Sequence, residues 1–201
     1  MKISAIRRLR RNQLPASTVQ LARFLIGKTL VRELPSGRLS GRIVETEAYL
    51  PDDAACHAFR GPTPRNRSLF LEHGHAYVYF IYGSSFMMNV SGEKPGIGAG
   101  VLLRAIEPIE GIDWMKRHRR TKQLLDLARG PGRLASAMKI DHRLDGVDLC
   151  ADGPIWLGTA IRRRGAIGAS CRIGITRDAH LILRFYERGN AFVSGPARLR
   201  A

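Results

Sequence analysis

The stretch RLSGRIVETEAYL at positions 38–50 decides the fold of this chain. It reads as a long, half-buried strand, and it follows a shorter candidate strand at 28–34 and a Pro-Ser-Gly-Arg turn at 35–38. A short turn between two strands makes a hairpin, so the pairing is antiparallel. Glu45, Glu47 and Tyr49 stand two residues apart and therefore project from one face. Because burying a carboxylate is costly, one that is kept in an apolar strand often performs chemistry.

The other elements follow from the same kind of pattern. Ser17 is a candidate N-cap for a helix that stops at Gly27, residues 110–129 read as a second helix, and a short third helix begins near Gly132. Residues 51–68 read as an ordered functional loop. Further strands are expected at 76–82, 86–91, 100–107, 154–161, 171–176 and 181–186. Strands early and late with helices between them predict an α+β fold, a single domain with a curved, mainly antiparallel β-sheet surrounded by helices.

Charge is the strongest compositional signal. The 201-residue chain has a formal net charge of +16, and 27 of its 33 basic residues are Arg, the side chain that grips phosphate with two hydrogen bonds. A hydrophobic content of 44% favours a folded globule over a disordered basic tail, and the length suits one domain over 1–201. A polyanionic partner is the leading explanation of the charge. A GC-rich genome that prefers Arg codons is the alternative.

The chain contains no apolar run of membrane-span length. Its basic N-terminus lacks the apolar core of a secretory signal, so no membrane partner and a cytoplasmic location are expected. Residues 1–14 are interpreted as a basic arm that rests on phosphate, with a transit peptide to an organelle as the alternative.

The three cysteines, Cys56, Cys150 and Cys171, are widely spaced and form no pattern typical of a zinc site. We therefore expect reduced thiols, no metal and no cofactor. Cys56 stands beside His57, which is compatible with a thiol nucleophile, but a small buried residue is the commoner role of a free cysteine.

A second informative stretch, YVYFIYG at 77–83, brings three tyrosines close together. Tyrosine is a flat amphipathic side chain that can stack on a base while its hydroxyl stays in water. Stacking platforms, a carboxylate in an apolar strand and a very basic chain together point to chemistry on a nucleobase.

Several blocks in register make the chain resemble the alkyladenine (3-methyladenine) DNA glycosylase family. They are RIVETEAYL (42–50), His57, TPRNR (63–67), YVYFIYG (77–83), MMNV (87–90), VLLRAIEP (101–108), GPGRL (130–134) and RFYERGNAFVSG (184–195). The resemblance implies a monofunctional base-excision enzyme. Such an enzyme flips a damaged, alkylated or deaminated purine out of double-stranded DNA and hydrolyses its N-glycosidic bond.

The resemblance also implies roles in hydrolysis. Glu47 takes the position of the general base, with Glu45 as its rival and the more structural of the two. Arg104, in an apolar strand, matches the Arg that helps to hold the attacking water, and a structural Glu–Arg pair is the compatible alternative. A backbone carbonyl of the family is placed on Ile175, although Thr176 follows where better-studied members have Gly.

Base recognition is implied for a second group of residues. Tyr49 and Tyr79 match the pair that sandwiches the flipped base, and His57 matches the third wall. Asn89 matches the residue that crowds the guanine 2-amino group and so disfavours normal purines. Tyr82 matches the residue that is wedged into the gap left by the extruded nucleotide.

Two other functions compete with base excision. A nucleic-acid-binding module without catalysis would explain the charge and the tyrosines, but it gives no reason for Glu47 and Arg104 in apolar strands. An RNA-modifying enzyme that flips a base is the second, and only the family match separates it from a DNA enzyme. A monomer is expected by default.

Overall fold

A single curved antiparallel sheet forms the frame of the molecule. The computed structural model describes residues 5–196, and within them the sheet has eight strands. Six lie in the order β3-β4-β5-β2-β1-β6, while β8 pairs with β2 and β7. The strands are β1 (Thr29–Leu34), β2 (Gly37–Tyr49), β3 (Ala76–Ile81), β4 (Ser85–Ser91), β5 (Gly100–Glu110), β6 (Ile155–Gly158), β7 (Ile167–Ser170) and β8 (Arg184–Glu187). The α+β fold predicted from the sequence is therefore confirmed.

Strand β2 is the centre of this sheet. It pairs along its length with β5, and on its other side its first half pairs with β1 and its second half with β8. Leu39 to Ala48 are buried without interruption, although this run includes Arg42, Glu45 and Glu47. Register shifts interrupt the pairing with β5 on both sides of Glu45, as β-bulges do where a strand re-aims side chains. The carboxylates are thus built into a long buried run of the central strand.

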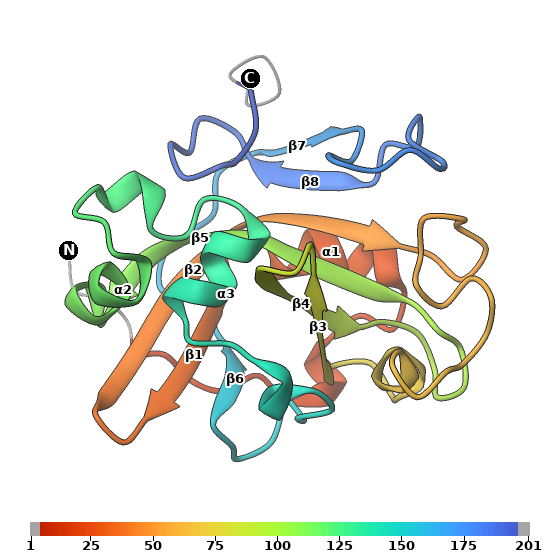
Figure 1. The fold of residues 1–201 in the computed structure, drawn as a ribbon, viewed down its shortest axis with the longest axis horizontal. Helices are drawn as coiled ribbons and strands as arrows, with labels where there is room; N and C mark the ends of the chain where they lie inside the picture. Colours follow the sequence, from red (N-terminus) through yellow and green to blue (C-terminus); the bar gives the residue numbers. More distant parts are fainter. Residues whose placement is uncertain (1–4, 197–201) are drawn as a thin grey trace.

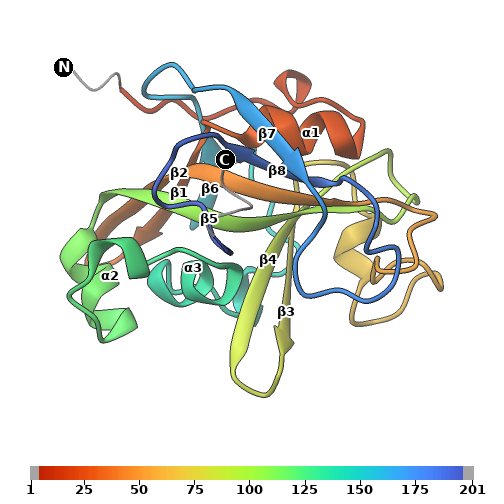
Figure 2. The same ribbon diagram turned by 90° about the horizontal axis from the view of Figure 1, so that it is seen from above.

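Helices cover both faces of the sheet. Figure 2 shows α1 (Thr18–Leu25) on one side, and α2 (Ile112–Arg119) and α3 (Pro131–Ala137) on the other. Helix α1 starts after Ser17 and buries Leu21, Ala22 and Leu25, residues at helical spacing. The chain then turns at Gly27, where φ is +88°, a conformation that glycine adopts at little cost.

Two segments differ from the sequence-based expectation. The helix expected over 110–129 ends at Arg119, because Arg120 adopts a left-handed conformation with φ +49° and a 3₁₀ turn follows at Leu124–Asp126. Residues 171–176 were expected to form a strand but form a loop, while β7 lies just before them at Ile167–Ser170. The loop bends at Gly174, where φ is +80°. Figure 1 shows β7 and β8 together along one edge of the fold.

The described part of the basic N-terminal segment packs on the body of the protein. The amide of Leu9 donates to the carbonyl of Leu157 in β6. Arg8 pairs with Asp152, and Arg11 pairs with Glu72 and Asp148. Residues 1–4 of the expected arm lie outside the described residues. No helix within residues 5–196 is long and apolar enough to cross a membrane.

Candidate active site

A cavity of about 300 Å³ opens where the ends of β2, β3, β4 and β5 meet two loops. Its volume falls in the range of sites that bind small molecules. Aromatic and apolar side chains dominate its wall, with a few polar groups among them. The lining residues are Tyr49, Ala55, Cys56, His57, Leu69, Tyr77, Tyr79, Ile81, Tyr82, Met87, Asn89, Gly100, Leu102, Arg104, Pro131, Ile173, Gly174 and Ile175. Seven of the eight residues that the sequence analysis placed in the site are among them, and the eighth, Glu47, lies directly behind the wall.

The carboxylate of Glu47 is fully buried and accepts three hydrogen bonds. Its Oε1 accepts from the amide of Ile173 at 2.8 Å, and its Oε2 accepts from the Tyr49 hydroxyl at 3.0 Å and from Arg104 Nη1 at 3.1 Å. All three donors line the cavity. Burial raises the pKa of Glu47 above the ordinary glutamate value and outweighs these donors, which act in the opposite direction.

Glu45 occupies a different environment two residues earlier. It accepts from Arg104 Nε at 2.8 Å, from Arg184 Nε at 2.7 Å, and from both the amide and the hydroxyl of Ser194. Burial acts to raise the pKa of Glu45, but Arg104, Arg184 and Ser194 outweigh it and keep that pKa below its ordinary value. Glu45 is therefore an ionised partner of two arginines, and it does not line the cavity.

Arg104 of β5 links the two carboxylates. Its Nε contacts Glu45 and its Nη1 contacts Glu47, so both carboxylates project from the face of β2 that the period-two alternation predicted. Only 6% of Arg104 is exposed. The structural Glu–Arg pair that the sequence offered as an alternative is present with both carboxylates, whereas the role of Arg104 in holding the attacking water stays a prediction.

Aromatic rings form one end of the cavity. Tyr77 and Tyr79 stack with centroids 5.2 Å apart, and His57 meets Tyr79 edge-on at 4.5 Å. Nδ1 of His57 lies 2.9 Å from the Tyr77 hydroxyl. Burial lowers the pKa of His57, and the charge of Arg65 lowers it further, which favours the neutral imidazole.

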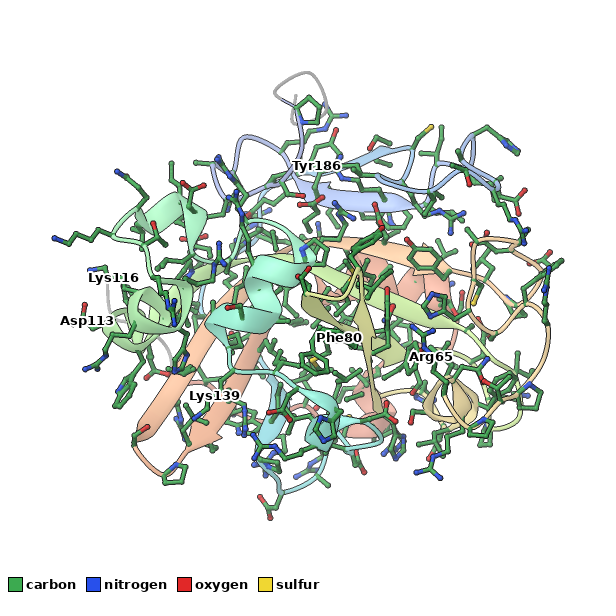
Figure 3. All side chains as sticks on the ribbon, in the orientation of Figure 1. Arg65, Phe80, Asp113, Lys116, Lys139 and Tyr186 are labelled. Carbon is green, nitrogen blue, oxygen red and sulfur yellow. The ribbon has the colours of Figure 1, made fainter. Side chains whose placement is uncertain are left out.

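The arginine that acts on His57 also supports the aromatic wall. Arg65 donates to the carbonyl of Phe80 at 3.0 Å and lies 6.0 Å from the ring centroid of Tyr79. Figure 3 labels Arg65 and Phe80 close to one another beside β3. Burial raises the pKa of Tyr79 to about 12, with smaller contributions from its charged and phenolic neighbours, so its hydroxyl stays protonated.

Asn89 and Ile175 lie on the cavity wall as well. Asn89 in β4 is 6% exposed, pairs in register with Tyr77 and Leu102, and its side chain makes no hydrogen bond within residues 5–196. Its amide is therefore available to a group in the cavity. Ile175 belongs to the loop after β7, where it lines the cavity two residues beyond the amide that contacts Glu47.

Tyr82 stands at the tip of the β3–β4 hairpin, which Figure 2 shows projecting from the body of the fold. It is 75% exposed and adopts φ +56°, followed by Gly83 at φ +64°. Two successive positive φ values are typical of the turns that suit β-hairpins, but for tyrosine the left-handed region costs about 1–2 kcal/mol. Such strain is concentrated at functional positions.

Three contacts were missed by the sequence analysis. Tyr77 shares a strand face with Tyr79, and that spacing could have identified it. The amide of Ile173 and the guanidinium of Arg172 come from a loop whose path no local pattern predicts. Arg172 binds Asp53 and lies 4.6 Å from the ring centroid of Tyr49.

Comparison with known proteins identifies the family. The model of the methylpurine-DNA glycosylase family (MPG) matches residues 12–191. The chain belongs to the methylpurine-DNA glycosylase family. Three relatives carry the name "Putative 3-methyladenine DNA glycosylase". One from Mesorhizobium japonicum is 63% identical over 94% of this chain and 91% of its own length. One from Paraburkholderia phytofirmans is 53% identical over 95% of this chain and 90% of its own length. One from Methanocella arvoryzae is 47% identical over 88% of this chain and 90% of its own length.

Membership confirms the resemblance noted in the sequence. It makes the chain a DNA glycosylase of DNA repair, a hydrolase of N-glycosyl bonds that acts on alkylated bases in DNA. Within residues 5–196 of this glycosylase, Cys56, Cys150 and Cys171 are free thiols. No group of three or more His, Cys, Asp or Glu side chains in that range is arranged to hold a metal ion.

Proposed function

We propose that this glycosylase flips a damaged purine out of double-stranded DNA and releases it by hydrolysis, with Glu47 activating the water. The proposal rests above all on one observation: a buried carboxylate whose three hydrogen-bond donors, Tyr49, Arg104 and Ile173, all line an aromatic cavity. A base in that cavity brings its glycosidic bond to the carboxylate.

Glu47 serves two needs of the reaction. It takes a proton from the attacking water, and its negative charge stabilises the oxocarbenium-like sugar that develops as the bond to the base breaks. Its raised pKa suits a general base, because the acceptor strength of the carboxylate increases with that pKa. Arg104 orients Glu47 and reaches the same wall of the cavity. Backbone groups at Ile173 to Ile175 complete the surroundings of the water.

The aromatic wall recognises the base. Tyr49, His57 and Tyr79 offer flat faces to the flipped purine, and stacking of this kind tolerates different bases. Asn89 has no partner of its own within the described residues and crowds the purine edge that carries the 2-amino group of guanine. A normal guanine is therefore disfavoured at this wall. A cationic alkylated purine is a good leaving group, so the reaction needs no strong general acid.

Tyr82 and the surface around it suit duplex DNA. Tyr82 fills the gap that the flipped nucleotide leaves, since it is exposed and fixed at a hairpin tip. A groove of about 410 Å³ beside it is lined by Arg119, Arg129 and Arg133. These side chains can receive the phosphates next to the extruded nucleotide. A monomer is sufficient for this arrangement, because one chain supplies every group named.

The test is the release of free base. The protein is mixed with duplex DNA treated with a methylating agent, and the products are separated for free 3-methyladenine and 7-methylguanine. We expect free methylpurine and an abasic site in the duplex. The same assay on single-stranded DNA and on methylated duplex RNA serves as a control for the duplex preference. Binding of methylated duplex without release of base would contradict the proposal.

A further inference from the structure

Arg172 touches four separate parts of the site. It lies in the loop after β7, its side chain is fully enclosed, and its Nη1 donates to the carbonyl of Ala48 at 3.0 Å. Both of its terminal nitrogens bind the carboxylate of Asp53, and Nη2 also reaches the carbonyl of Asp178 at 3.3 Å. Its guanidinium carbon lies 4.6 Å from the ring centroid of Tyr49.

These contacts join the two loops that flank the cavity. The carboxylate of Asp53 also accepts a hydrogen bond from the amide of Ala55. The backbone carbonyl of Asp53 accepts one from the amide of Cys56, the residue before His57. On the other side, the residue after Arg172 is Ile173, whose amide binds Glu47. The guanidinium thus connects the loop that carries His57, the loop that contacts Glu47, and the carbonyl between Glu47 and Tyr49.

The position of Arg172 against Tyr49 has a second effect. Tyr49 lines the cavity and Arg172 does not, although its guanidinium packs over the ring; we infer that the cation occupies the face of the ring turned away from the cavity. Burial acts against the charge of Arg172, but Asp53 outweighs burial and raises the pKa of Arg172, which keeps it cationic. A cation is attracted to the negative face of an aromatic ring. With one face already occupied by a cation, Tyr49 attracts a second cation on its other face less strongly.

We propose that Arg172 is a positioning residue of this site and that its charge behind Tyr49 reduces the preference of the pocket for cationic over neutral bases. This inference rests on the proposed base excision. Asp53 neutralises part of the charge, so the effect on preference is modest. The positioning effect applies to every base, because it acts through Glu47 and the cavity loops.

The experiment measures single-turnover release from two duplexes that differ only in the lesion, 7-methylguanine as the cationic base and hypoxanthine as the neutral one. Arg172→Met removes the charge, whereas Arg172→Lys keeps it but loses the planar grip on Asp53. Arg42→Met is the matched control, because Arg42 is also a buried arginine paired with a carboxylate, Glu187, and it does not line the cavity. If Arg172→Met does not fold, the double variant Arg172→Met with Asp53→Asn replaces it. This variant lacks both charges of the buried pair, and removal of both partners is better tolerated than removal of one.

We expect Arg172→Met to raise the ratio of 7-methylguanine to hypoxanthine release about two- to tenfold, the size of a cation–π contribution. Arg172→Lys should keep the wild-type ratio while slowing both reactions about ten- to a hundredfold per folded molecule, as misplaced catalytic groups do. Arg42→Met should change neither the ratio of the two release rates nor the rates themselves per folded molecule. The inference would be overturned if Arg172→Met slowed the release of 7-methylguanine and of hypoxanthine equally. It would also be overturned if Arg172→Met and Arg172→Lys changed the ratio of the two release rates to the same extent. A wild-type protein that releases neither base would overturn the proposed function itself.

Discussion

The hydroxyl of Tyr49 donates a 3.0 Å hydrogen bond to Oε2 of Glu47, two residues earlier on the same strand face. In the proposed function, one tyrosine thereby provides both a wall for the base and a donor to the general base. This bond lowers the pKa of Glu47, whereas burial, the larger effect, raises it. The proposed function therefore predicts that base binding and water activation are coupled through this single side chain.

Tyr49→Phe tests this coupling. Glu47 must be ionised to act as a base, so release should fall as the pH falls through its pKa, which lies above the ordinary glutamate value. Loss of the phenol removes a donor to the carboxylate, so the acid limb of the pH–rate profile should move upward by about one pH unit. Single-turnover rates across the pH range provide the measurement. An unmoved acid limb would mean that Glu47 does not titrate in this profile.

Glu47→Gln and Glu45→Gln separate the two carboxylates. Glu47→Gln should reduce release of the damaged purine by about 10²–10⁴-fold or more and leave binding of damaged DNA nearly intact. The glutamine keeps the shape of the side chain but cannot accept a proton from the water. Glu45→Gln should chiefly destabilise the fold, by about 3–5 kcal/mol, since it removes a buried anion that pairs with both Arg104 and Arg184. Denaturant unfolding and single-turnover assays distinguish them. A folded but inactive Glu45→Gln beside an active Glu47→Gln would reverse the assignment.

Tyr82→Gly and Tyr82→Ala probe the hairpin tip. Both should weaken binding to a lesion-containing duplex far more than binding to undamaged DNA, because filling the gap compensates for unstacking. The glycine variant should in addition be more stable than the alanine variant by about 1 kcal/mol, since only glycine accepts φ +56° without strain. Thermal unfolding and titration of the two duplexes supply the comparison. Equal losses on both duplexes would leave Tyr82 as an ordinary surface residue.

The pair of Arg42 and Glu187 predicts an acid limit of stability. Burial works to raise the pKa of Glu187, but Arg42, the Gly165 amide and Asn190 outweigh it and lower that pKa to about 2. A depressed folded-state pKa contributes stability above the unfolded value near 4.5, and this contribution is lost as the pH falls toward about 2. The free energy of unfolding of the wild type, measured with denaturant, should therefore fall by about a few kcal/mol between pH 5 and pH 2. The free energy of unfolding of Glu187→Gln should fall less over this interval. Parallel curves for the two proteins would exclude this pair as the cause.

Borohydride should trap no covalent adduct with damaged duplex DNA. Of the six lysines of the chain, the five that lie within residues 5–196 do not line the cavity, so none of these five is placed to form a Schiff base with the sugar. Gel analysis after reduction, with a lysine-dependent glycosylase as the positive control, provides the readout. A trapped adduct would show that an amine of the protein attacks the sugar in place of water.

The sequence predicted the centre of the fold better than its edges. The β1–β2 hairpin, α1 and strands β3 to β5 follow from alternation, capping and turn residues that act locally. Glu45 and Glu47 could be placed on one face by counting alone, but their different environments depend on Arg184 and Ile173, which approach from more than 120 residues away. The helix after Gly111 was overextended because an apolar pattern continues past Arg120, where the backbone turns left-handed. Loop contacts such as Arg172 with Asp53 have no periodic signal.

The place of β2 at the centre of the sheet determines how the enzyme loses activity. The segment that carries Glu47 pairs with β5 on one side and with β8 on the other, so we expect that it does not separate from the fold by local opening. Amide hydrogens of its inner half should therefore exchange with solvent only through the largest cooperative opening of the molecule. Heat inactivation and loss of the whole sheet are therefore expected to be one event, whereas the hairpin tip that carries Tyr82 lies between β3 and β4, which do not pair with β2.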